Sequence, residues 1–290
     1  MQGQEAKFGY TPLPLSVQHH PFEPAASFVS RLAMRNGMET VSRFCETIGF
    51  PYAALLAGKV DAIELLAQLG GCDEEELKHA SIRNLGQMRM RLRDEVLSSS
   101  TVHRSHNRVC PLCIKKDIGD TGEFWNAWRR IWWKFPSIRS CAIHQCALVT
   151  LPTDSYLPKH YDFSAQIRKH WSFIITSEVV PQARTEFEDY LEKRIAGHRG
   201  RTWIDQLDLS MTIRACEALG FRLVVGEQAK MSGFSSADWA RFEDRGYRVM
   251  KRGPKAFSDA RSRLFARGMV NRRTLAGVPV PHADPGAKPQ

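Results

Sequence analysis

The sequence lacks the features that export, membrane insertion and several common enzyme families require. No window of its 290 residues approaches the roughly 18 consecutive apolar residues of a membrane helix. Glu5, Pro12 and Pro14 stand where a signal peptide would have an apolar segment. A glycine-rich phosphate loop, a Gly-x-Ser-x-Gly elbow and a helical His-Glu-x-x-His motif are also missing. These absences predict a cytoplasmic protein that is not an enzyme.

Cysteine is scarce and unevenly placed: of the seven in the chain, four lie in one short stretch. A secreted disulfide scaffold would be shorter and more evenly cross-linked. The pairs Cys110-x-x-Cys113 and Cys141-x-x-His144 have the spacing that lets one turn present two ligands to a single ion. They predict one closed, structural Zn²⁺ site, without which residues 108–151 should lose their fold. Cys146 competes with His144 for the fourth position, and buried free cysteines are the alternative.

Positive charge is in excess, with a formal net charge of +10, but not in the first third of the chain. Residues 1–95 have 10 Lys+Arg against 12 Asp+Glu, whereas residues 241–273 have 11 against 3. Such a run can follow a phosphate backbone, although a solvated helix face or a loose tail has the same composition. The predicted nucleic-acid contacts are Arg241, Arg245, Arg248, Lys251, Arg252, Lys255, Arg261 and Arg263.

Apolar spacing predicts a mainly α protein. It predicts an N-terminal helix over residues 28–34 with Ser27 as its N-cap. Ala67, Gly71 and Leu77 have the spacing of a helix-turn-helix, in which two helices cross closely. A plain helical hairpin is the alternative, because the second helix opens on glutamates that repel phosphate.

Two further stretches have the residue spacing of helices. Trp125, Trp128 and Trp132 recur at helical spacing, which predicts one apolar stripe. We favour core packing for these rings over stacking on nucleic-acid bases. Near the C-terminus, residues 210–219 predict a helix that ends at Gly220.

The expected organisation has four parts. Residues 1–97 form an N-terminal helical domain with the helix-turn-helix-like unit, and residues 98–155 form a central zinc-finger or ribbon segment. Residues 156–277 form a helical, basic C-terminal domain. Residues 278–290 are proline-rich and are expected to form a disordered tail.

Four motifs in order resemble the TniQ family. They are Ser27-Phe28-Val29-Ser30-Arg31-Leu32-Ala33 with Asn36-Gly37, Leu66-Ala67 to His79, Cys110-Pro111-Leu112-Cys113, and Trp128-Arg129-Arg130 to His144. Together they span residues 11–151. The sequence departs from the family pattern in two places, since no second Cys-x-x-Cys follows Leu148 and Gln145 replaces a glycine.

The resemblance implies an accessory protein of DNA transposition. Such a protein is a non-catalytic adaptor that links target recognition, by DNA or an RNA-guided complex, to an AAA+ ATPase regulator, and some members form homodimers. A stand-alone zinc and helix-turn-helix DNA-binding regulator is the alternative. A nuclease that uses a metal ion other than the structural zinc is a third and less favoured hypothesis, because no set of carboxylates stands out by its spacing.

Overall fold

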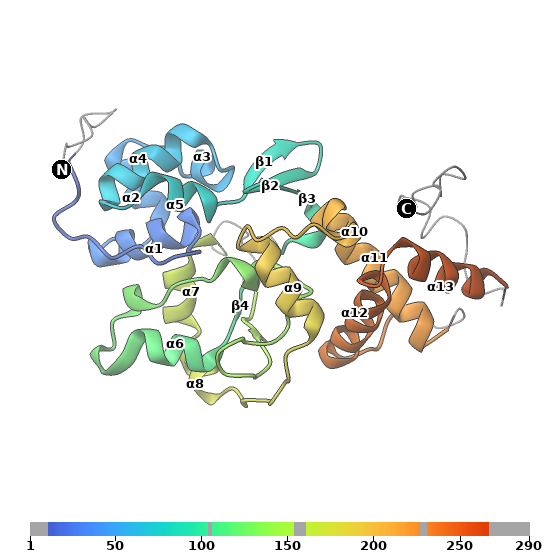
Figure 1. Cartoon of the computed structure of the whole chain (residues 1–290). Helices are drawn as coiled ribbons and strands as arrows, with labels where there is room; N and C mark the ends of the chain where they lie inside the picture. The colour runs from blue at the N-terminus through green and yellow to red at the C-terminus, as the bar shows by residue number, and fades with distance from the viewer. Residues whose placement is uncertain (1–10, 104–105, 154–160, 227–230, 267–290) are drawn as a thin grey trace. The chain divides into compact units, whose positions relative to one another are not determined.

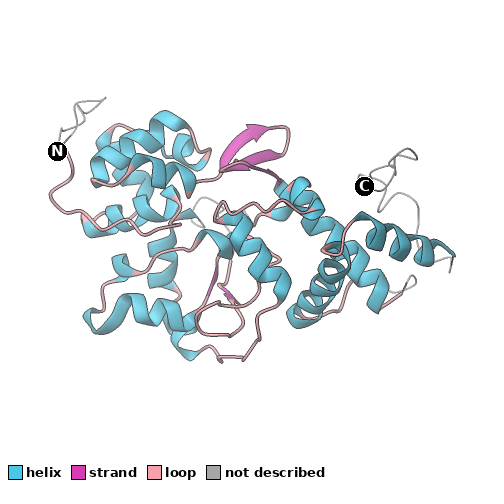
Figure 2. Ribbon diagram, in the orientation of Figure 1, coloured by secondary structure: helices cyan, strands magenta, loops and turns pink. Residues whose placement is uncertain are grey.

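The computed structural model describes residues 11–103, 106–153, 161–226 and 231–266. It divides into two compact units, Met1–Arg184 with Ile195–Gly197 and Thr185–Arg194 with His198–Gln290. Helices dominate both units, so the predicted fold class is confirmed (Figures 1 and 2). No helix in these ranges is long and apolar enough to cross a membrane. The tail expected over residues 278–290 lies outside the described residues, and the four-part division stays a prediction.

The first unit begins with five helices around a shared apolar core. Phe28 and Leu32 of the first helix pack in that core with Ile63, Leu66 and Leu77, and all five side chains are fully buried. The helices are α1 (Ala25–Arg35), α2 (Val41–Ile48), α3 (Tyr52–Leu56), α4 (Val60–Gly70) and α5 (Glu74–His79).

The predicted N-cap of the first helix is wrong. Helix α1 begins at Ala25, after Pro24, and Ser27 lies inside its first turn. The Ser27 hydroxyl instead donates a 2.7 Å hydrogen bond to the buried carboxylate of Glu23. A buried carboxylate must be paired, and Arg31 also donates to it at 2.7 Å. Ser27 and Arg31, which belong to the first of the four motifs, therefore stabilise the interior of the helical domain.

Helices α4 and α5 form the predicted helix, tight turn and helix. Gly71 ends α4 in the left-handed conformation with φ 64°. Asp73 caps α5 by accepting a 2.7 Å hydrogen bond from the Glu76 N–H. A β-carbon on Gly70 would lie 2.4 Å from the Phe28 ring, so glycine at this position permits the close packing of α4 on α1.

A three-stranded antiparallel sheet follows, which the sequence analysis did not predict. Its order is β1-β2-β3, and each strand has only four residues. Only β2 has a clear alternation of buried and exposed residues, and its exposed positions are arginines rather than typical strand formers. The strands are β1 (Arg83–Gly86), β2 (Arg89–Leu92) and β3 (Glu95–Ser98).

The central segment of the first unit consists of short elements. The predicted helix with a tryptophan stripe over residues 124–135 is wrong, because Ala127 and Arg130 have extended backbones between two 3-10 turns. The elements are η1 (Ser99–Thr101), β4 (Arg108–Val109), α6 (Pro111–Ile118), η2 (Gly119–Thr121), η3 (Phe124–Asn126), η4 (Ile131–Lys134), β5 (Val149–Thr150), α7 (Phe163–Lys169) and α8 (Trp171–Thr176).

Tertiary contacts hold this segment out of a helix. The Trp128 ring stacks on His20 at 4.6 Å, and the Arg130 guanidinium covers it at 3.9 Å. Arg130 in turn pairs with Asp117 of α6. Trp128, which is partly buried, thus packs against both side chains, which favours packing within the fold over base stacking for this ring.

The second unit is built on two long helices, α11 and α12, packed against each other. The predicted end of a helix at Gly220 is wrong, since α11 continues to Val224. Its apolar core includes Phe221, Phe242 and Phe257, all buried. The helices assigned to this part of the chain are α9 (Glu186–Ile195), α10 (Trp203–Gln206), α11 (Leu209–Val224), α12 (Ser236–Met250) and α13 (Pro254–Ala266).

Candidate metal centre

Two turns of the same local geometry present the cysteine and histidine side chains. Cys110 follows β4 and caps α6, and the Cys113 N–H donates to its Sγ at 3.5 Å. In the second turn, the His144 N–H donates to Cys141 Sγ, also at 3.5 Å. Such N–H donors favour the thiolate that a metal needs. The two turns are held together by the antiparallel pairing of β4 with β5.

The four donor atoms have the separations that a tetrahedral ion requires. Zn–S and Zn–N bonds of about 2.3 and 2.0 Å place donors about 3.8 Å apart for S–S and about 3.5 Å for S–N. Cys113 and Cys141 Sγ are 3.6 Å apart. The Nδ1 atom of His144 lies 3.4, 3.3 and 3.6 Å from the sulfurs of Cys110, Cys113 and Cys141. These residues can therefore bind a metal ion.

The burial of this centre and its number of protein donors are those of a structural metal site. The three cysteines are buried and His144 is partly buried. Four protein donors complete a tetrahedral site and leave no position for water or substrate. Within the described ranges, no second group of three or more metal-ligating side chains occurs.

Cys146, the competing ligand, is adjacent to the group but not part of it. Its Sγ lies 3.6 Å from Cys110 Sγ, yet the four donors that lie within 4.8 Å of one another are those with His144. The Cys146 carbonyl accepts a 2.8 Å hydrogen bond from the Cys141 N–H, and Ser140 pairs with Ala147. This arrangement gives Cys146 a place in the hairpin that carries the second turn.

Gln145, where the family pattern has glycine, adopts the backbone conformation that glycine favours. Its φ is 47°, in the left-handed region. Its N–H donates a 2.9 Å hydrogen bond to the Cys141 carbonyl and closes the turn that places His144. The turn therefore forms despite the substitution, with backbone strain of about 1 kcal/mol.

Two buried arginines stabilise the surroundings of the centre. Arg130 donates to both carboxylate oxygens of Asp117 on α6. Arg108 of β4 donates to the carbonyls of Trp133 in η4 and of Phe135 directly after it. Carbonyl oxygens in loops have no ladder partner, and a guanidinium satisfies several of them at once. The loop after α6 is thereby tied to the strand that leads into the first turn.

The structure places the predicted nucleic-acid contacts on α12, the turn after it and α13. Three are engaged by carboxylates: Arg241 with Asp238 at 3.2 Å, Arg248 with Asp244 at 2.7 Å, and Lys251 with Glu186. In the described part of the chain, the other five have no carboxylate partner: Arg245, Arg252, Lys255, Arg261 and Arg263.

Comparison with known proteins identifies the family. A family model described as TniQ matches residues 14–148, which include α1 to α6 and all four candidate metal ligands. No curated protein and no solved structure matches the chain.

Proposed function

The chain belongs to the TniQ family, and from this premise we propose that it is a non-catalytic adaptor in DNA transposition. The family is associated with accessory proteins of transposition. The adaptor links the recognition of a target, by DNA or an RNA-guided complex, to an AAA+ ATPase regulator in the cytoplasm. The observation that carries the proposal is the family match over residues 14–148.

The metal centre supports a binding role rather than catalysis. We propose that Cys110, Cys113, Cys141 and His144 hold one structural Zn²⁺. All four donors come from the chain, so the ion contributes folding free energy and has no open coordination position. Zinc would fix the start of α6 against the hairpin that follows η4.

The basic helices of the second unit are the proposed nucleic-acid contacts. Arg245, Arg252 and Lys255 are exposed, and no described carboxylate neutralises them. Lysine and arginine side chains of this kind displace counterions from phosphates and so provide salt-dependent affinity. Arg241, Arg248 and Lys251 contribute less, because each is already in an ion pair.

The alternative, a stand-alone regulator that reads DNA through α4 and α5, has less support. Helix α5 opens on Glu74, Glu75 and Glu76, which repel phosphate. The ammonium group of Lys78 on the same helix is held by Glu64, Glu74 and Glu75. These ion pairs raise the pKa of Lys78 and occupy its charge, so α5 offers no free cation to a phosphate.

Binding to the ATPase separates the two functions. The full chain is mixed with the AAA+ ATPase of the same transposon, with and without ATP, and complex formation is followed by light scattering. The adaptor is expected to bind the ATPase directly. DNA binding by the chain together with no ATPase complex under any nucleotide condition contradicts the adaptor and leaves the regulator.

A further inference from the structure

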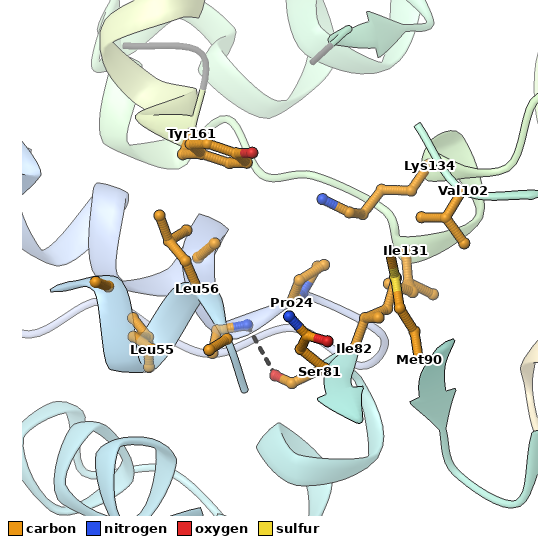
Figure 3. Close-up of a pocket in the computed structure, with 15 residues that line it drawn as sticks. Pro24, Leu55, Leu56, Ser81, Ile82, Met90, Val102, Ile131, Lys134 and Tyr161 are labelled. Atoms are coloured by element: carbon orange, nitrogen blue, oxygen red, sulfur yellow. Dashed lines mark hydrogen bonds between the residues drawn. The ribbon is translucent and has the colours of Figure 1, made fainter. Parts of the chain in front are cut away.

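Strand β2 of the hairpin has one buried apolar face and one exposed cationic face. Met90 and Leu92 of β2 are 7% and 1% exposed and point inward, whereas Arg89 and Arg91 alternate with them and are exposed. The inner face borders a cavity of about 330 Å³ that Met90 and Ile131 help to line (Figure 3). The open face of this ribbon is therefore the arginine face.

The arginine face has a like-charge pair that folding alone does not explain. Arg83 of β1 lies directly opposite Arg91 of β2 in the antiparallel register. Like charges at opposed positions destabilise a sheet. Arg83, Arg89 and Arg91 are all exposed, and no described side chain pairs with them. The charge is thus uncompensated at a cost to stability, a pattern typical of surfaces selected for binding.

Protection of a sheet edge does not account for these arginines. Charged side chains on an edge strand prevent pairing with other chains. In the order β1-β2-β3, however, β2 is the central strand, and two of the three arginines lie on it. Because β2 has no free edge, protection of an edge cannot be the role of its arginines.

The ribbon is fixed at its base. The Asn84 N–H donates a 2.9 Å hydrogen bond to the Ala57 carbonyl, which joins β1 to the end of α3. Gly58 lies so close that an added β-carbon would be 2.7 Å from the Arg83 α-carbon. At the other end of the hairpin, the Ser99 N–H donates to the Met88 carbonyl at 2.9 Å. These contacts fix the backbone that carries the arginines before any ligand binds.

We propose that the β1–β2 ribbon is a second DNA-binding element, which binds duplex DNA through its arginine face. The major groove of B-form DNA is about 12 Å wide and has phosphates on both sides, so arginines on two adjacent strands of one sheet face can contact the phosphates along it. The major groove of A-form RNA is too deep and narrow for protein side chains to read. The ribbon belongs to the first unit, whereas the basic helices α12 and α13 belong to the second, and its assignment to DNA rests on the proposed function in transposition.

The test is a charge-neutralising triple variant of the full chain, Arg83→Gln, Arg89→Gln and Arg91→Gln. Binding to a fluorescent DNA duplex is measured by anisotropy over a series of salt concentrations. The matched control, Arg43→Gln, Lys116→Gln and Arg168→Gln, removes the same charge from exposed positions elsewhere in the first unit. The ribbon variant should bind about tenfold more weakly at ~0.1 M salt, and its log–log salt slope should fall by about 2 to 3.

Two further measurements make the result decisive. The ribbon variant should be at least as heat-stable as the parent, since the Arg83–Arg91 repulsion is removed. A lowered melting temperature would make the arginines structural and overturn the proposal, as would DNA binding equal to that of the control. An RNA duplex of the same sequence should bind the parent more weakly, and equal binding would overturn the assignment to DNA.

Discussion

Gly220 of α11 and Gly246 of α12 face each other where the two helices cross, and neither position has room for a β-carbon. One added to Gly220 would lie 1.7 Å from the Phe242 carbonyl oxygen. One added to Gly246 would lie 1.9 Å from the Cys216 carbonyl oxygen. Backbone therefore packs directly on backbone at this crossing, and side chains such as Phe221 and Trp239 pack around it.

Gly220→Ala should destabilise the chain. In a helix free of neighbours, alanine would be more stable than glycine by about 1 kcal/mol. Here the methyl group meets backbone atoms that cannot move independently, and such overpacking costs about 1–3 kcal/mol or more. Urea unfolding followed by circular dichroism measures the loss, with the exposed helical substitution Arg214→Ala as control. A gain in stability for Gly220→Ala would contradict the observed helix crossing.

Cys113→Ser should remove bound zinc, from about one ion per chain to near zero, and should lower thermal stability. The reason is that the hydroxyl cannot replace the thiolate in the proposed site. Metal content by atomic absorption and thermal unfolding are the measurements. Cys72→Ser, a partly buried cysteine outside the cluster, is the control. Cys146→Ser should retain zinc, and loss of zinc in that variant would place Cys146 among the ligands.

Protonation of His20 should lower the free energy of unfolding in mildly acidic solution. Burial lowers the pKa of His20 to about 4, and the charges of Arg31 and Arg130 add to the effect. In the unfolded chain the pKa is near 6.5, so the unfolded state takes up a proton first. The contribution of neutral His20 to the free energy of unfolding is fully present above pH 6.5 and is lost as the pH falls towards 4.

The variant His20→Phe isolates this contribution. Phenylalanine keeps a ring against Trp128 but does not titrate. The difference in free energy of unfolding between the variant and the parent should be constant above pH 7. It should shift in favour of the variant between pH 6.5 and 4. A difference that does not change with pH would refute the assigned pKa.

The ion pairs of α12 divide the C-terminal basic residues into two matched sets. Reversing the unpaired set, Arg245, Arg252 and Lys255, to glutamate should weaken DNA binding strongly at low salt and little at high salt. Reversing the paired set, Arg241, Arg248 and Lys251, should weaken it less, because carboxylates already neutralise those charges. Equal effects of the two sets, or binding independent of salt, would contradict the proposed contacts.

Some sequence patterns were misleading because they are local. Trp125, Trp128 and Trp132 have helical spacing, yet Trp128 packs against Arg130 and His20 and the backbone between the turns is extended. A glycine such as Gly220 is typical of a helix end, but a glycine inside a helix also permits two helices to cross closely. Only the position of the partner helix distinguishes the two cases.

The sequence by itself determined the mainly helical class, the family, from motifs in a fixed order, and the two pairs of candidate metal ligands. The helical class and each ligand pair depend on spacing within one or two turns, where backbone geometry leaves few choices. The choice of His144 over Cys146 came from the structure. The tertiary structure decided that Gly220 is a crossing point. It also brought Arg83 opposite Arg91, because the register of a hairpin depends on its turn, on the bulge after Asn84 and on which face is buried.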